Sequence, residues 1–180
     1  MNESKQSSYN LQSLINLLED EDDAVRRKAR KSLVIMGSKA VATLSFTLEN
    51  SKIYKARWEA AKALGSIGDV RSIPTMIKAL EDPESDVAWL AAKALKKMGK
   101  AAWPELFHVL VKRGPESVQL QHGAHYILRK QADGGFDDLL QILREALVSF
   151  SNPESISLAA YNILERMKEQ AEPNETDLST

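Results

Sequence analysis

The chain has 180 residues, 43% of them hydrophobic and 27% charged, with a net charge of −1, which is typical of a soluble globular protein. It contains no cysteine, which excludes disulfides and thiolate metal sites. No stretch approaches the roughly 20 apolar residues of a membrane span, and the polar start MNESKQSSYN lacks the apolar core of a signal peptide. We therefore expect a cytoplasmic protein that makes no contact with the membrane.

Apolar residues recur along the chain at intervals of three and four, which is the pattern of amphipathic helices. Alternating β-branched runs joined by hairpin turns are absent, so the sequence predicts an all-α fold. The predicted helices span about 11–18, 24–36, 40–50, 54–67, 72–81, 85–98, 103–110, 120–128, 136–147 and 156–167.

Three glycines mark a repeat in this helical pattern. Gly37, Gly68 and Gly99 each close a helix, and 31 residues separate each from the next. A fixed period in this range indicates a stacked array of repeats, here about five antiparallel helix pairs. We predict one domain over 9–170 between disordered tails at 1–8 and 171–180, with units of about 9–37, 38–68, 69–99, 100–132 and 133–170.

Residues 56–69, A-R-W-E-A-A-K-A-L-G-S-I-G-D, resemble the short HEAT-like repeat of the phycobilisome-lyase type. Val25-Arg26 with Ala29 is a further match, and the resemblance covers nearly all of 10–168. It implies a right-handed α-solenoid in which the second helix of each pair lines the concave surface. Arg26 and Arg57, which match the repeat's arginine position, are interpreted as structural residues that bridge neighbouring repeats or bind carbonyls.

The second helices can be aligned on the core alanines Ala29, Ala60, Ala91, Ala124 and Ala160. Positions two before and two after each alanine point away from the core. The earlier row reads Arg27, Trp58, Trp89, His122 and Leu158, and the later row reads Lys31, Lys62, Lys93, Tyr126 and Asn162. Lys96 and Arg129, five residues after their alanines, add charge on the same side.

Two tryptophans beside a lysine row are typical of a binding surface. The predicted partner-binding residues are Arg27, Lys31, Trp58, Lys62, Trp89, Lys93, Lys96, His122, Tyr126 and Arg129. Another interpretation stays open, in which the indoles of Trp58 and Trp89 lie flat over the small Ala61 and Ala92 and only cover the backbone.

Residues that would carry catalysis or hold a cofactor are missing from the sequence. His122 and His125 lie one helical turn apart and could share a metal, but no carboxylate lies within a turn of them. The His-Glu pairs of metal-dependent hydroxylases built on HEAT-like repeats do not occur, and neither do the phosphate-binding glycine motifs. We expect no catalytic residues, no cofactor and no metal.

The sequence thus favours a non-catalytic scaffold that binds a protein or peptide, preferably an acidic one, in the concave groove. One alternative is nucleic-acid binding, as in HEAT-like alkylpurine DNA glycosylases, although a pI near 6.3 argues against it. Another is an accessory role for a lyase-type enzyme.

The charge is unevenly distributed along the chain, since residues 1–132 hold 21 Lys+Arg and 15 Asp+Glu whereas residues 133–180 hold 3 and 10.

Overall fold

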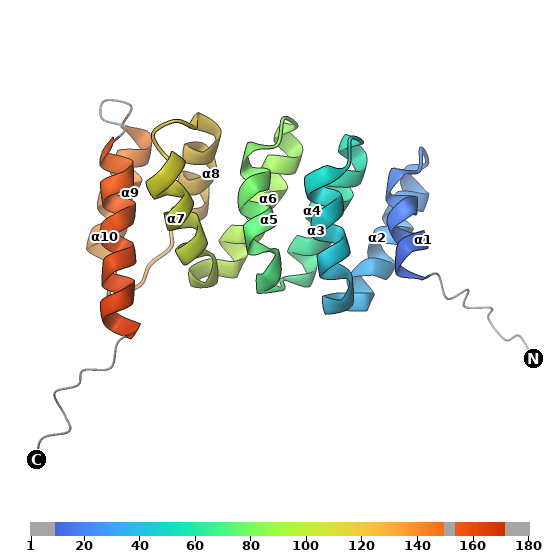
Figure 1. The fold of residues 1–180 in the computed structure, drawn as a ribbon, viewed down its shortest axis with the longest axis horizontal. Coiled ribbons are helices and arrows are strands. Elements are labelled where there is room, and N and C mark those ends of the chain that lie inside the picture. Colours follow the sequence, from blue (N-terminus) through green and yellow to red (C-terminus); the bar gives the residue numbers. More distant parts are fainter. Residues whose placement is uncertain (1–9, 150–153, 172–180) are drawn as a thin grey trace, which may run out of the picture. The chain divides into compact units, whose positions relative to one another are not determined.

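A computed structural model describes residues 10–149 and 154–171, and all regular structure in these two ranges is helical (Figure 1). The predicted all-α fold class is confirmed. The chain forms two compact units, with the boundary in sequence between Leu95 and Lys96. The predicted tails lie outside the described residues, except that Ala171 is the last residue of the C-terminal helix.

The first unit holds helices α1 to α5 and most of α6. Tyr54–Ile67 and Ser85–Met98 coincide with the predicted helices at 54–67 and 85–98. The predicted helix at 72–81 is shorter in its α-helical part, because 3-10 turns replace both of its ends. The α-helices are α1 (Leu11–Asn16), α2 (Asp23–Met36), α3 (Val41–Asn50), α4 (Tyr54–Ile67), α5 (Ile73–Lys78) and α6 (Ser85–Met98), and the 3-10 turns are Leu17–Glu19, Gly37–Ala40, Val70–Ser72 and Ala79–Glu81.

These helices form two layers. Helix α3 packs against α1, α5 and α4, and α2 packs against α1 and α4. The first helices α1, α3 and α5 therefore make one layer, and the second helices make the other. Gly65 of α4 lies so close to α6 that an added Cβ would be 3.0 Å from the Cβ of Ala94. The fully buried side chains that fill the space between the layers are Leu18, Leu33, Leu44, Leu64, Met76, Leu80 and Leu95.

The predicted glycine stops are confirmed. Gly37, Gly68 and Gly99 have φ values of 59°, 71° and 61°, a region in which a side chain would clash with the backbone. Gly68 adopts the left-handed conformation and its N–H donates to the carbonyl of Leu64, which ends α4. The 31-residue spacing of these glycines therefore marks the positions at which the helices end.

The second unit begins with the last residues of α6 and has an aromatic core. Trp103 is buried against Phe107 and Phe136, with ring centroids 5.8 and 6.0 Å away. Both distances suit the tilted and edge-to-face arrangements that aromatic rings prefer. Its elements are the 3-10 turn Gly99–Ala102, α7 (Trp103–Arg113), α8 (Val118–Leu128), α9 (Asp137–Val148) and α10 (Glu154–Ala171).

Within the second unit, the last helix pair has its layers exchanged relative to the pair α7 and α8. Helix α9 packs against α8, and α10 packs against both α7 and α9 (Figure 1). The hydroxyl of Ser157, near the start of α10, donates to the carbonyl of Val111, near the end of α7, at 2.9 Å. Helix α10, the second helix of its pair, therefore lies in the same layer as α7, which is the first helix of the pair α7 and α8.

This exchange corrects the predicted rows at their C-terminal end. Leu158 and Asn162 were aligned with His122 and Tyr126 on the assumption that α10 continues the layer of α8. Since α10 packs on α7 instead, neither residue extends the rows. Periodicity locates a helix in the sequence but does not say which layer it joins.

Candidate functional site

The outward face of α2, α4 and α6 is set by the alanines beneath it. Ala29, Ala60 and Ala91 have exposed fractions of 2%, 0% and 0%, so they occupy the packed side of their helices as predicted. Small side chains at such positions let neighbouring helix backbones approach closely. Residues two positions before or after them are therefore turned away from the core.

Two tryptophan–lysine pairs occupy equivalent positions on α4 and α6. The Lys62 ammonium lies 4.2 Å from the ring centroid of Trp58, and the Lys93 ammonium lies 4.9 Å from that of Trp89. The four-residue spacing brings both pairs onto one side of their helix, and the distances are those of cation–π interactions. Trp89 is 51% exposed, whereas Trp58 is more deeply buried than Trp89.

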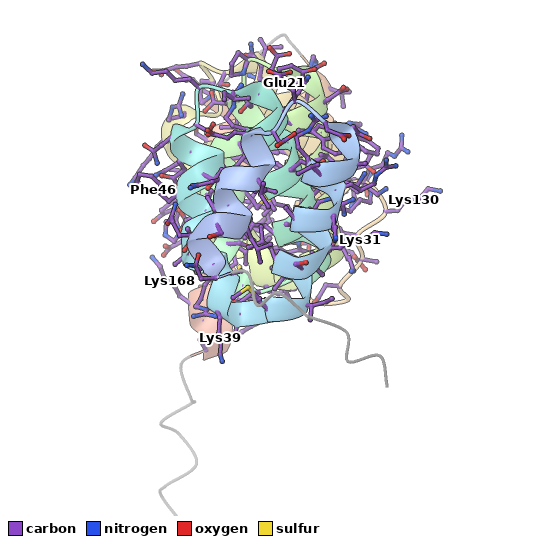
Figure 2. The ribbon with its side chains drawn as sticks, turned by 90° about the vertical axis from the view of Figure 1, so that its right-hand side faces the viewer. Glu21, Lys31, Lys39, Phe46, Lys130 and Lys168 are labelled. Carbon is purple, nitrogen blue, oxygen red and sulfur yellow. The ribbon has the colours of Figure 1, made fainter. Side chains whose placement is uncertain are left out.

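Three lysines repeat at the same position on successive helices. Lys31, Lys62 and Lys93 all follow their core alanine by two residues. No salt bridge found within the described ranges involves any of the three, so their charges are not neutralised by a neighbouring carboxylate. Lys31 points outward from α2 in Figure 2, on the side opposite to Phe46 of α3. We call the set Lys31, Trp58, Lys62, Trp89 and Lys93 the Trp–Lys face.

Arg27 lies beside this face but is partly neutralised. Its guanidinium is 3.2 Å from the carboxylate of Asp23, one turn earlier in α2. Both side chains are more than half exposed, so this ion pair is weak. Arg27 can therefore bind a carboxylate of a partner in place of Asp23.

The remaining predicted residues lie in the second unit, and one of them has a structural role. The Lys96 ammonium donates to the carbonyls of Tyr126 and Arg129 at 2.8 and 2.6 Å, and it lies 4.7 Å from the Tyr126 ring centroid. These carbonyls belong to the end of α8, where helix carbonyls lack partners within the helix. Burial, with the nearby charges of Arg129 and Lys130, lowers the pKa of Lys96.

His122 and Arg129 are exposed and Tyr126 is half-buried. The binding role of these three and of Lys96 stays a prediction.

The two arginines interpreted as structural are confirmed in that role. Arg26 donates to the carbonyls of Asp20 and Glu21 at 2.6 and 2.8 Å. Arg57 binds both carboxylate oxygens of Asp82 in the next repeat, at 2.7 and 3.0 Å, and the carbonyl of Ser51. Arg57 and Asp82 line a cavity of about 400 Å³ together with Glu49 and Lys78, which also bind each other.

One buried ion pair was not predicted. Arg30 Nε donates to Glu59 Oε2 at 2.6 Å, and the two side chains are 13% and 2% exposed. Arg30 directly follows the core alanine of α2, a position where α4 and α6 carry Ala61 and Ala92. A charged residue at a position that is alanine in the next two repeats was the available signal.

Candidate metal ligands and membrane segments were also sought in the structure. Within residues 10–149 and 154–171, no cluster of three or more His, Asp or Glu side chains could hold a metal ion. None of the helices in these ranges combines the length and apolar character that a bilayer crossing requires.

Comparison with known families points to one kind of repeat. Residues 44–121, from α3 into α8, match the family model of HEAT repeats. No curated protein matches the chain. The match includes both Trp–Lys pairs but does not separate the phycobilisome-lyase type from other HEAT repeats. Together with the stacked helix pairs and the 31-residue glycine spacing, it supports HEAT-like repeats over residues 44–121.

Proposed function

We propose that the chain is a non-catalytic scaffold that binds a protein or peptide through the Trp–Lys face of its first unit. HEAT repeats commonly mediate protein interactions. The observation that carries the proposal is the repeated pair of a tryptophan with a lysine over its ring, on α4 and again on α6. Tryptophan is enriched among the few hot-spot residues that carry most of the binding energy at protein interfaces.

The electrostatics of the face favour an acidic partner. The charges of Lys31, Lys62 and Lys93 have no carboxylate partner among the described residues. A partner carboxylate that approaches Lys62 or Lys93 would gain an ion pair while the cation–π interaction holds the ammonium in place. The exposed half of Trp89 would cover an apolar group beside that carboxylate.

The test is affinity purification with the wild-type chain and with the double variant Trp58→Ala/Trp89→Ala. We expect the variant to lose the captured partner, by about 30-fold or more in affinity if either indole is a hot spot. Circular dichroism should show that its helix content is retained, since neither indole is fully buried.

Phe46→Ala is the matched control. Phe46 is an aromatic residue, 68% exposed, on the opposite side of the first unit (Figure 2). We expect it to bind the partner as the wild type does. Equal capture by the wild type and the double variant would show that the Trp–Lys face is not the binding surface.

A further inference from the structure

The three lysines of the Trp–Lys face define a spacing that a ligand must match. Lys31, Lys62 and Lys93 stand at equivalent positions on α2, α4 and α6. Helix α2 packs directly on α4, and α4 meets α6 at Gly65 and Ala94. Helices packed in this way have axes about 8–10 Å apart, so we expect the three lysine positions to recur at about that interval across the helices.

The indoles add a second constraint, because each lies on the same helix as its lysine and touches it. The distances of 4.2 and 4.9 Å place one aromatic surface directly beside each of two ammonium groups. A ligand that crosses the helices therefore meets a cation and an apolar surface together, first at α4 and then at α6. Such a strip suits a single polypeptide backbone with alternating acidic and apolar groups.

Polyproline II is a backbone conformation whose repeat fits both constraints. It has three residues per turn and rises about 3.1 Å per residue, so every third side chain points the same way about 9.3 Å further on. In a β-strand, residues three apart point to opposite faces. In an α-helix, side chains on one face three or four residues apart are only about 5–6 Å from each other. Aromatic surfaces also bind proline-rich segments in this conformation.

We propose that the Trp–Lys face binds an extended, proline-containing acidic segment whose carboxylates recur at every third residue. The carboxylates pair with Lys31, Lys62 and Lys93, and the residues between them lie on the indoles of Trp58 and Trp89. This inference rests on the proposed function and adds the conformation and spacing of the ligand.

Two synthetic peptides of one composition test the spacing. The first, Glu-Pro-Ala-Glu-Pro-Ala-Glu, carries carboxylates at every third residue, and the second places its three glutamates together. Fluorescence anisotropy of labelled peptides on the full chain reports the affinity. We expect the spaced peptide to bind at least about fivefold more tightly, because only its carboxylates are spaced to match lysines on helices whose axes are about 8–10 Å apart.

Lysine variants test whether the ammonium groups of the Trp–Lys face bind the carboxylates of the spaced peptide. Lys62→Gln should weaken binding of the spaced peptide about threefold, and the triple variant Lys31→Gln/Lys62→Gln/Lys93→Gln should bind the two peptides equally. Lys39→Gln is the control, since Lys39 lies in the turn after α2 and outside the Trp–Lys face (Figure 2). It should keep the wild-type preference.

The outcomes separate this inference from the proposed function. Equal binding of the two peptides, or tighter binding of a helical peptide with glutamates seven residues apart, would overturn the extended register. If neither peptide binds but Trp58→Ala/Trp89→Ala still loses its partner, the register is wrong while the face remains a protein-binding surface. If the peptides fail and the double variant keeps its partner, both proposals fall.

Discussion

At the scale of single residues, the ion pair of Arg30 and Glu59 stands out in the first unit because both of its side chains are largely buried. Both partners lie next to core alanines, in the seam where α2 packs on α4. A buried charge is tolerated only when its partner and hydrogen bonds offset the loss of water. The pair therefore fixes how these two repeats face each other.

Removal of one charge should destabilise the protein strongly. Glu59→Gln leaves the Arg30 guanidinium buried without its counter-charge, and we expect a loss of about 3 kcal/mol in the free energy of unfolding. Urea denaturation followed by circular dichroism measures it. Glu49→Gln is the control, because Glu49 pairs with an exposed lysine, Lys78, at 3.3 Å and should cost less than about 1 kcal/mol. Similar costs for the two variants would contradict the structural role given to the buried pair.

The Trp–Lys pairs and the buried ion pair show what could be predicted at this scale. Trp58 and Lys62 stand out in the sequence because an aromatic and a charged residue recur at positions that must face outward. Arg30 departs from the repeat at a position that faces a neighbouring helix, and its partner lies 29 residues away in another repeat. Periodicity assigns a side chain to a face, but it does not identify a partner on a different helix.

At the scale of elements, the helices of the first three repeats follow from local signals, whereas the order of the last pair does not. Glycine stops and apolar stripes locate α2, α4 and α6 to within a residue of the predicted ranges. Helices α9 and α10 show the same stripes, yet they join the layers of α8 and α7 respectively. The chain between α8 and α9 carries no repeat signal for this change of order, and in it Lys130 adopts a positive φ of 67°.

Gly114 offers a test of the packing of α10 on α7. A Cβ at this position would lie 2.8 Å from the Ile156 side chain of α10 and would also clash with the Leu110 carbonyl. We expect Gly114→Ala to destabilise the protein by about 1–3 kcal/mol, because α10 or the end of α7 must shift to make room. Thermal unfolding measures the loss.

The control for this variant is a glycine with free space around it. At Gly134 no atom lies within 4 Å of the added Cβ, so Gly134→Ala should leave the melting temperature nearly unchanged. A Gly114→Ala variant as stable as the wild type would show that α10 does not approach α7 as closely as the structure indicates.

At the scale of the whole molecule, charge decides between a protein partner and a nucleic acid. A chain with a net charge of −1 and a pI near 6.3 has no net positive charge to attract a polyanion. Proteins that hold DNA release counterions from many phosphates and need an extended basic surface to do so. Three lysines and two indoles can bind the carboxylates of a short segment, but they neutralise few phosphates.

We therefore expect the chain to bind duplex DNA more weakly than about 10⁻⁴ M at physiological salt, the weak end of non-specific DNA binding. An electrophoretic shift assay repeated over a salt series measures this. A shift that weakens steeply with added salt, and that the Lys31→Gln/Lys62→Gln/Lys93→Gln variant loses, would assign the face to nucleic acid instead. A shift that the triple variant retains would place any DNA contact elsewhere, and it would leave the Trp–Lys face free for a protein.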